Sequence, residues 1–270
     1  MTDYYLSFDV EDWFHSHNLR PGLDWNRWDE YELRVVENTR RILDLLSQHD
    51  TTATFFVLGH VADRAPELVA EIDDRGHELA SHGYGHELLY EQSHEEVRAD
   101  IERSVQLLSS LADQPIRGYR APSFSITEGA LDVLVDVGVE YDSSRFPASG
   151  HDRYGDVAVT STETITTTTN GLTEVQLPLL DLTVAEVPWA GGGYFRFIPY
   201  PVYRRGLGRI AEHRDVVFYL HPWEIDPDQP RVTDIPFQYR LRHYANLDRT
   251  EPRLERLLAD FDWQPIEQAV

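Results

Sequence analysis

The sequence of 270 residues contains no cysteine and no lysine. Without cysteine, the chain cannot form disulfides, a thiolate metal site or a catalytic thiol. All 24 basic residues are therefore arginines, and 47 acidic residues bring the formal net charge to −23. A negative field of this size makes nucleic acids and anionic membranes unsuitable partners.

Long apolar runs are missing as well. No stretch approaches the roughly 18 apolar residues that a membrane helix needs, so we expect no membrane insertion. The first twelve residues, MTDYYLSFDVED, have neither the basic segment nor the apolar core of an export signal, which predicts a cytoplasmic protein.

The acidic residues do not mark a disordered chain, because 6 Trp, 14 Tyr and 11 Phe supply material for a core. The acids are spread along the chain and are not gathered in a tail. Together with the missing lysine, this pattern favours a folded protein of a halophilic organism. Salt would then screen the repulsion between its surface carboxylates.

Runs of β-forming residues alternate with helical patterns along most of the chain. Strands are expected at residues 4–9, 52–58, 76–81, 116–120, 139–142, 216–221 and 264–266, with short β pieces at 157–168, 173–177 and 182–187. Helices are expected at 31–48, 61–74, 93–112, 127–137, 201–213 and 251–261. Ser93 and Glu96 suggest a capping box, and Thr127 an N-cap. This alternation predicts an α/β fold, a parallel sheet or barrel of βα units, in a single domain over residues 1–270.

Ionisable side chains follow most of these strands directly. They are Asp9, Glu11 and Asp12 after the first strand, His82 and His86 after the third, then Arg120, Asp142 and His221 after later ones. Active sites of parallel α/β folds lie at the C-terminal ends of the strands, so we expect these side chains to meet at one rim.

The first two groups together predict a metal site. Three carboxylates within four residues, in Asp9-Val10-Glu11-Asp12, repel one another unless a cation lies between them. His82 and His86 are four residues apart and can bind one metal from a helix or a tight loop. Two imidazoles and one carboxylate suit Zn²⁺, Fe²⁺, Co²⁺ or Mn²⁺ and leave positions open for water and substrate.

Two further residues suit acid–base chemistry. Arg120 can pair with a spare carboxylate and hold it ionised. His221 follows the apolar run VVFYL and can act as a general acid, because the pKa of histidine lies near working pH.

Several motifs in this order resemble the polysaccharide deacetylases with a NodB-type homology domain, carbohydrate esterase family 4. The matching segments are FDVEDWF (8–14), TFFVLG (54–59), ELASHGYGHE (78–87), GYRAPSFS (118–125), YDSSRFP (141–147), GGGYFRFIPY (191–200) and YLHPWEID (219–226). The chain is most similar to the branch with a DVEDWF first motif and a C-terminal HPWE segment. The resemblance implies a distorted (β/α) barrel with about seven parallel strands and a family-specific C-terminal part from about 190 to 270.

The resemblance also implies a function and a set of roles. The function would be metal-dependent hydrolysis of the N-acetyl group of an amino sugar in a glycan or glycan precursor, most often with Zn²⁺. Asp9 would be the base, His221 the acid, Arg120 the residue that orients the base, and Asp142 the acid that tunes His221. His82 and His86 would be metal ligands.

Two positions depart from the usual family motifs. Val10 separates Asp9 from the next acid, so either Glu11 or Asp12 could be the carboxylate ligand. Strand alternation favours Glu11, which would share a face with Asp9, whereas a turn beginning at Val10 favours Asp12. Gly83 stands where the family usually has Ser or Thr.

The sugar itself would contact residues near these motifs. The oxyanion of the reaction would receive a backbone N–H near Ala121, beside Pro122. Aromatic side chains that could line the sugar site are Trp13, Phe14, Phe124, Tyr194 and Trp223. Two other functions stay open: hydrolysis of a cyclic amide such as allantoin, and carbohydrate binding without turnover.

Overall fold

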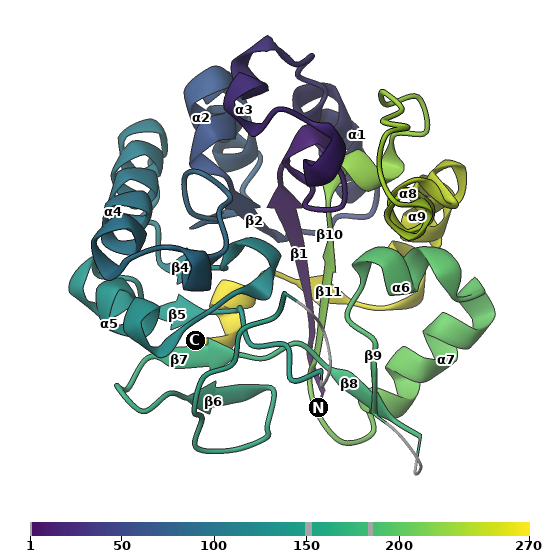
Figure 1. Cartoon of the computed structure of the whole chain (residues 1–270). Coiled ribbons are helices and arrows are strands. Elements are labelled where there is room, and N and C mark those ends of the chain that lie inside the picture. Colours follow the sequence, from purple (N-terminus) through teal and green to yellow (C-terminus); the bar gives the residue numbers. More distant parts are fainter. Residues whose placement is uncertain (1, 149–152, 183–185) are drawn as a thin grey trace.

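Seven parallel strands form a curled sheet at the centre of the computed structural model, which describes residues 2–148, 153–182 and 186–270 (Figure 1). Across the sheet they are β10 (Val216–Leu220), β1 (Tyr4–Val10), β2 (Thr54–Val57), β3 (Glu78–Ser81), β4 (Gly118–Tyr119), β5 (Tyr141–Asp142) and β7 (Thr173–Val175). The prediction of a distorted barrel with about seven parallel strands is confirmed. The sheet closes only part of a barrel.

Four short strands complete the β structure of the residues that the structure describes. Strand β6 (Ile165–Thr167) runs antiparallel to β7, β11 (Trp263–Gln264) pairs with β1, and β8 (Leu179–Asp181) pairs with β9 (Glu186–Pro188). The predicted pieces at 157–168 and 173–177 contain β6 and β7. Residues 183–185 of the third predicted piece lie outside the described residues.

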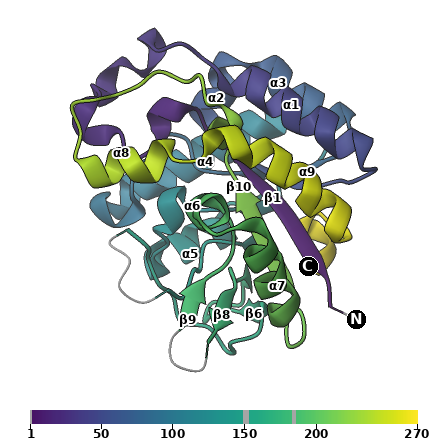
Figure 2. The same ribbon diagram turned by 90° about the vertical axis from the view of Figure 1, so that its right-hand side faces the viewer.

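Nine helices of the described residues lie outside the curled sheet. They are α1 (Val35–Gln48), α2 (Gly59–Arg64), α3 (Pro66–Asp74), α4 (His94–Leu111), α5 (Glu128–Asp136), α6 (Gly192–Phe197), α7 (Tyr200–Ile210), α8 (Phe237–Tyr244) and α9 (Thr250–Asp260). Figures 1 and 2 show α2 to α5 along one side of the strands and α6 to α9 along the other. None of these helices has the length and apolar character that crossing a membrane would require.

Most predicted helices are present, with changes at their ends. The capping box of Ser93 and Glu96 opens α4 as predicted, and Thr127 caps α5. The predicted helix 61–74 is instead two helices, because Ala65 leaves the helical region at φ −142° and ψ 62°. Its neighbour Pro66 causes this break, since a residue before proline is driven out of the helical conformation.

The sequence did not predict helix α8. Phe237 and Leu241 lie one turn apart on this helix and are both exposed, so its apolar residues do not mark a buried face. Helical periodicity detects a helix only when one face is buried.

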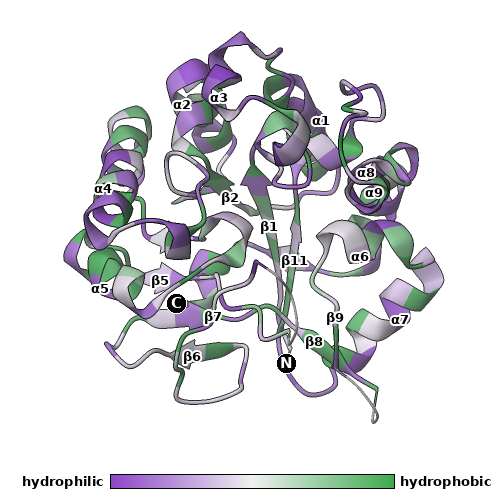
Figure 3. Ribbon diagram, viewed as in Figure 1, coloured by the Kyte–Doolittle hydropathy of each residue, from purple (hydrophilic) through white to green (hydrophobic). Residues whose placement is uncertain are grey.

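Alternate residues of β1 point to opposite faces of the sheet, and this directs Asp9 to the inside of the curl. Leu6, Phe8 and Val10 pack in the core between the sheet and the outer helices. Ser7 and Asp9 point to the inside of the curl and are also buried. Figure 3 shows both hydrophobic and hydrophilic colour on β1 and on the helices around it. Because both faces of the sheet are covered, β2 and β10 are continuous runs of apolar, aromatic and β-branched residues.

Candidate active site

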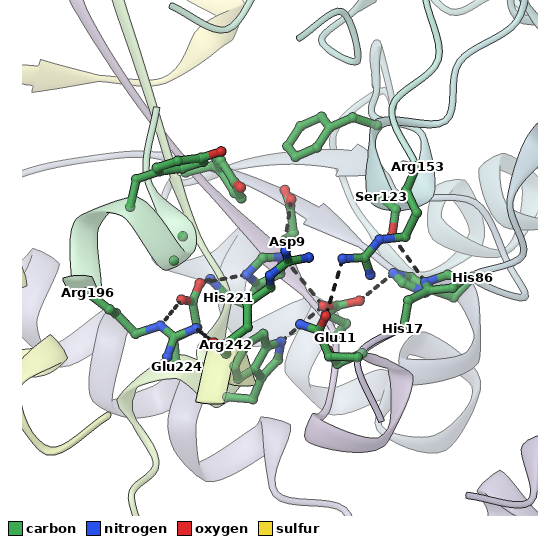
Figure 4. A pocket seen from close by; sticks show the side chains of 18 of the residues that line it. Asp9, Glu11, His17, His86, Ser123, Arg153, Arg196, His221, Glu224 and Arg242 are labelled. Atoms are coloured by element: carbon green, nitrogen blue, oxygen red, sulfur yellow. Dashed lines mark hydrogen bonds and ion pairs between the residues drawn. The ribbon is translucent and has the colours of Figure 1, made fainter. Parts of the chain in front are cut away.

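The C-terminal ends of the parallel strands surround a pocket of about 300 Å³. Eight of the predicted residues line it: Asp9, Glu11, His82, His86, Phe124, Tyr194, His221 and Trp223. Figure 4 shows that the labelled side chains among them point toward a common centre from different parts of the chain. The prediction that strand ends bring these groups together therefore agrees with the geometry.

Asp9 forms a buried ion pair with Arg120. The Arg120 Nη1 atom lies 2.8 Å from Asp9 Oδ1 and 2.8 Å from Ser7 Oγ. Its Nε and Nη2 atoms donate to the backbone oxygen and the hydroxyl of Ser143. Arg120 is fully buried, so these contacts fix the orientation of the Asp9 carboxylate. The second Asp9 oxygen lies 3.8 Å from His221 Nε2.

Glu11, and not Asp12, lies beside the two histidines. Glu11 Oε2 contacts His86 Nε2, and Glu11 Oε1 accepts the indole N–H of Trp223 at 3.0 Å. Burial alone would raise the pKa of Glu11, but His86 and His221 lower it well below its ordinary range. The carboxylate is therefore ionised although it is buried.

Asp12 has a structural role. Its Oδ1 accepts the backbone N–H of Trp13, and its Oδ2 accepts those of Arg34 and Val35 at 2.6 and 2.8 Å. These contacts cap a short 3₁₀ helix at Trp13–His15 and the start of α1. The sequence predicted that this helix begins at Tyr31. The cap explains why α1 begins at Val35 instead.

The donor atoms of Glu11, His82 and His86 lie within 4.8 Å of one another and fit a metal ion. Nδ1 of His82 is 2.8 Å from the carbonyl oxygen of Arg120, so it carries the proton and leaves a lone pair on Nε2. Burial lowers the pKa of His82 to about 4, which keeps this ligand neutral at neutral pH. Glu11 Oε2 is also buried without a hydrogen-bond donor among the described residues. The donor set is the type that zinc and related divalent ions take.

The loop that carries the two histidines is held by an acid from α4. Asp100 accepts the backbone N–H groups of Tyr84 and Gly85 at 2.7 and 2.8 Å. Gly83 has a φ of +72°, and a Cβ added there would come within 2.7 Å of Asp100 Oδ2. Glycine at this position thus makes room for the carboxylate, which braces the loop where the usual motif offers a hydroxyl.

His221 belongs to a second chain of buried charges. Its Nδ1 lies 2.7 Å from Glu224 Oε1, and Glu224 Oε2 accepts the Arg196 Nε–H at 2.6 Å. Nε2 of His221 faces the pocket, 3.4 Å from Glu11 Oε1. Burial opposes protonation of His221, but Glu11, Glu224 and Asp9 outweigh it and raise its pKa to about 9. The imidazole is therefore protonated at neutral pH and can give a proton from Nε2.

Asp142 does not reach His221, contrary to the role expected for it. Its Oδ1 accepts the Ser144 hydroxyl at 2.5 Å, and it lies opposite Glu174 in the pairing of β5 with β7. Glu224 occupies the position beside His221 Nδ1 instead. Glu224 comes from the same short turn as His221, which brings it closer than a residue on a distant strand.

Four of the predicted substrate contacts are buried elsewhere. Trp13 and Phe14 pack in an aromatic cluster outside the pocket lining. The Ala121 N–H donates to Ser144 Oγ at 2.7 Å, so it is not free for an oxyanion. Ala121 and its neighbour Pro122 are buried outside the pocket lining. The structure thus places these four residues away from the pocket lining, because adjacency to a motif does not set the direction of a side chain.

Sequence analysis missed three residues that the structure brings to the pocket. Glu224 and Arg196 form the buried pair behind His221. His17 lines the pocket, with Nδ1 3.1 Å from Ser123 Oγ and a ring centroid 5.1 Å from that of His86. The sequence contained a signal for the pair. Glu224 follows His221 by three residues and Arg196 lies in the apolar run YFRF, and a charge buried at either place needs a partner of opposite charge.

Comparison with known families agrees with this geometry. The model described as Polysaccharide deacetylase matches residues 26–141, and a model described as Domain of unknown function (DUF3473) matches residues 143–270. Residues 26–141 are therefore similar to the polysaccharide deacetylase domain. Strand β1, which precedes both matched parts, pairs with β2 of the first part on one side and with β10 of the second part on the other, so both parts build one sheet.

Individual relatives are similar to the deacetylase domain over part of their length. A peptidoglycan-N-acetylglucosamine deacetylase of Bacillus cereus is 36% identical over 96 residues, which is 36% of this chain and 35% of the relative. The chain thus spans about a third of the length of the first curated relatives that it matches.

Solved structures show the same fold. A candidate polysaccharide deacetylase from Mycobacterium smegmatis aligns with a TM-score of 0.63 and 18% identity, over 99% of this chain and 88% of that one. A family 4 pseudoenzyme from Bacillus anthracis aligns with a TM-score of 0.54 and 14% identity, over 99% and 64% of the two chains.

Proposed function

We propose that this protein is a metal-dependent hydrolase that removes the N-acetyl group from an amino sugar in a glycan or glycan precursor. The observation that carries the proposal is the grouping in one pocket of a metal-binding set, a braced carboxylate and a protonated imidazole. The similarity to a named peptidoglycan-N-acetylglucosamine deacetylase supports the substrate class.

Glu11, His82 and His86 would hold the metal, with zinc as our first choice and Co²⁺, Mn²⁺ or Fe²⁺ as alternatives. A divalent cation held there would polarise the acetyl carbonyl as a Lewis acid. Asp12 is not among these ligands, because three backbone N–H groups already occupy its oxygens.

The remaining chemistry belongs to the protein's own acid and base. Asp9, fixed by Arg120, takes a proton from the water whose oxygen bonds to the acetyl carbon. His221 gives the proton on Nε2 to the sugar nitrogen as the C–N bond breaks, so that acetate and a free amine result. Phe124, Tyr194 and Trp223 line the pocket and would contact the sugar ring.

Metal analysis and acetate release test this proposal. We expect about one zinc per chain by elemental analysis after reconstitution, lost in His82→Ala and retained in His94→Ala, an exposed histidine on α4. Glu11→Gln should lose most of the metal, whereas Asp12→Asn should keep it. The wild type should release acetate from N-acetylglucosamine oligomers.

Two results would contradict the proposal. Metal content that is equal in the wild type and in His82→Ala would remove the proposed ligand set. Absence of acetate release after loading with Zn²⁺, Co²⁺ or Mn²⁺ would remove the reaction, and opening of a cyclic amide such as allantoin would then identify the competing activity.

We further propose that the protein works in high salt, as in a halophilic cytoplasm. The support is the net charge of −23 and the use of arginine, with no lysine, for all 24 Lys or Arg positions. The urea midpoint of unfolding should rise strongly between 0.1 M and 3 M KCl, because salt screens repulsion between surface carboxylates. A midpoint that does not change with KCl would contradict this adaptation.

A further inference from the structure

Two arginines line the pocket without belonging to the catalytic groups. Arg153 approaches from the side of His17 and Ser123, and Arg242 approaches from the side of Arg196 (Figure 4). The Nη2 atom of Arg153 donates to Asn18 Oδ1 at 3.2 Å. The role of a positive charge on these two sides is not explained by the reaction itself.

Arg196 holds the backbone at and after Arg242. Arg196 donates through Nη2 to the Arg242 carbonyl oxygen at 2.8 Å and through Nη1 to the carbonyl oxygens of His243 and Ala245. The next side chain, His243, is fully buried and stacks on Trp223 with a centroid distance of 4.2 Å. The guanidinium that orients Glu224 therefore also holds the end of α8 at the pocket.

The acids of the pocket are already matched by other partners. Asp9 pairs with Arg120, Glu224 pairs with Arg196, and Glu11 contacts His86. In the part of the chain that the structure describes, no acid forms an ion pair with the exposed Arg242 guanidinium. Its positive charge is therefore available to a ligand.

The charges of both arginines act on one tyrosine of the pocket lining. Burial raises the pKa of the Tyr154 hydroxyl, while the charges of Arg153 and Arg242 act in the opposite direction. Tyr154 also lines the pocket. The two guanidiniums thus act on one region of the rim.

We propose that the pocket selects an N-acetylated amino sugar that also carries an anionic oxygen group, a carboxylate or a phosphate, and that Arg242 with Arg153 binds this group. The inference rests on the proposed deacetylase function. A protein with a net charge of −23 repels anions over most of its surface, so an anionic substrate needs positive charge at the pocket. A guanidinium suits both groups because its parallel N–H donors match two anionic oxygens.

The test compares three sugars on the zinc-loaded full chain. N-acetylglucosamine is neutral, N-acetylmuramic acid carries a carboxylate, and N-acetylglucosamine 1-phosphate carries a phosphate. The quantity measured is the ratio of kcat/KM for each anionic sugar to kcat/KM for the neutral one, at fixed KCl. The ratio of Kd values from calorimetry, in an Asp9→Asn background that stops turnover, gives a second readout.

Arg242→Gln is compared with Arg240→Gln, which removes the same charge two residues away on α8, outside the pocket lining. We expect at least one anionic sugar to be preferred by the wild type. This preference should fall about tenfold in Arg242→Gln, the scale of one charge-assisted contact, and persist in Arg240→Gln. Preference for one anionic sugar alone would identify the carboxylate or the phosphate as the source.

Equal ratios for neutral and anionic sugars in the wild type would overturn the inference while leaving the deacetylase function in place. An equal loss in Arg240→Gln would also overturn it, because the effect would then come from the general field and not from contact. If no sugar releases acetate, the proposed function fails, and the Kd ratios alone decide whether the pocket selects anions.

Discussion

Glu224→Gln is expected to weaken both folding and catalysis, because two other buried groups share this carboxylate. Glu224 is fully buried, with one oxygen 2.7 Å from His221 Nδ1 and the other 2.6 Å from Arg196 Nε. Removing one partner of a buried ion pair costs about 3–5 kcal/mol, since the other charge stays buried without compensation. Loss of the oriented imidazolium should lower kcat for deacetylation by about 10²-fold or more.

A double-mutant cycle separates the pair from its surroundings. Arg196→Met removes the opposite charge, so the double variant should lose less free energy of unfolding than the two single variants added together, by about 1–3 kcal/mol. Urea unfolding measures these free energies, and acetate release measures kcat. Glu71→Gln is the matched control, because Glu71 pairs with Arg40 and Arg75 at the surface and its loss should cost less than about 1 kcal/mol.

Additivity in this cycle would mean that Glu224 and Arg196 do not stabilise each other, which would refute the folding part of the reasoning. A Glu224→Gln variant as stable and active as Glu71→Gln would mean that the buried contacts of Glu224 do not govern the state of His221. A stable but inactive Glu224→Gln would support the catalytic role and contradict only the estimate of the folding cost.

Three further predictions concern other parts of the fold. Burial raises the pKa of both facing carboxyls, Asp142 to about 6 and Glu174 well above its ordinary value. The free energy of unfolding should therefore fall as pH rises from about 4 through 6, and Glu174→Gln should flatten this fall in urea titrations at several pH values. Ser93→Ala should cost about 1 kcal/mol in the same assay, because it removes an N-cap. Gly191→Ala should cost at least about 2 kcal/mol by thermal unfolding, since φ is +139° and the new Cβ would lie 1.9 Å from the Tyr219 carbonyl oxygen. A stability that is unchanged in any of these variants would contradict the corresponding contact.

The sequence predicted the strands of the sheet well because both faces of the sheet are buried. Runs such as residues 54–57 and 216–220 are wholly apolar or β-branched, and they were recognised without knowledge of their neighbours. The polar residues after these strands were found for the same reason, since they interrupt an apolar run. Helix α8 was missed because its apolar residues Phe237 and Leu241 are exposed and do not form the helical repeat of a buried face.

Contacts between distant segments could not be predicted in the same way. The pKa of His221 was expected to be tuned by Asp142, yet Glu11, Glu224 and Asp9 raise it, and the contact with Nδ1 comes from Glu224, three residues away. The structural reason is that η6 (Pro222–Ile225), a short 3₁₀ helix, folds Glu224 back under the imidazole. Arg196 then compensates the buried charge from a segment 28 residues away. A sequence pattern shows that a buried acid needs a partner, but not which partner reaches it.

The choice between Glu11 and Asp12 shows which physical quantity decides such cases. Strand β1 ends at Val10, and the Glu11 N–H donates to the Asp9 carbonyl oxygen in a tight turn. Strand alternation, which favoured Glu11, and a turn near Val10, which favoured Asp12, are therefore both present. What separates the acids is the number of N–H donors that reach each carboxylate. Asp12 accepts three backbone N–H groups, two of them from residues 22 and 23 positions away, so both of its oxygens serve the backbone, and it is not among the acids grouped with the histidines. Glu11 accepts one indole N–H on Oε1, from a residue 212 positions away, and its Oε2 lies beside the histidines. Because nearly all of these donors are distant in sequence, only the folded chain distinguishes a capping carboxylate from a metal-binding one.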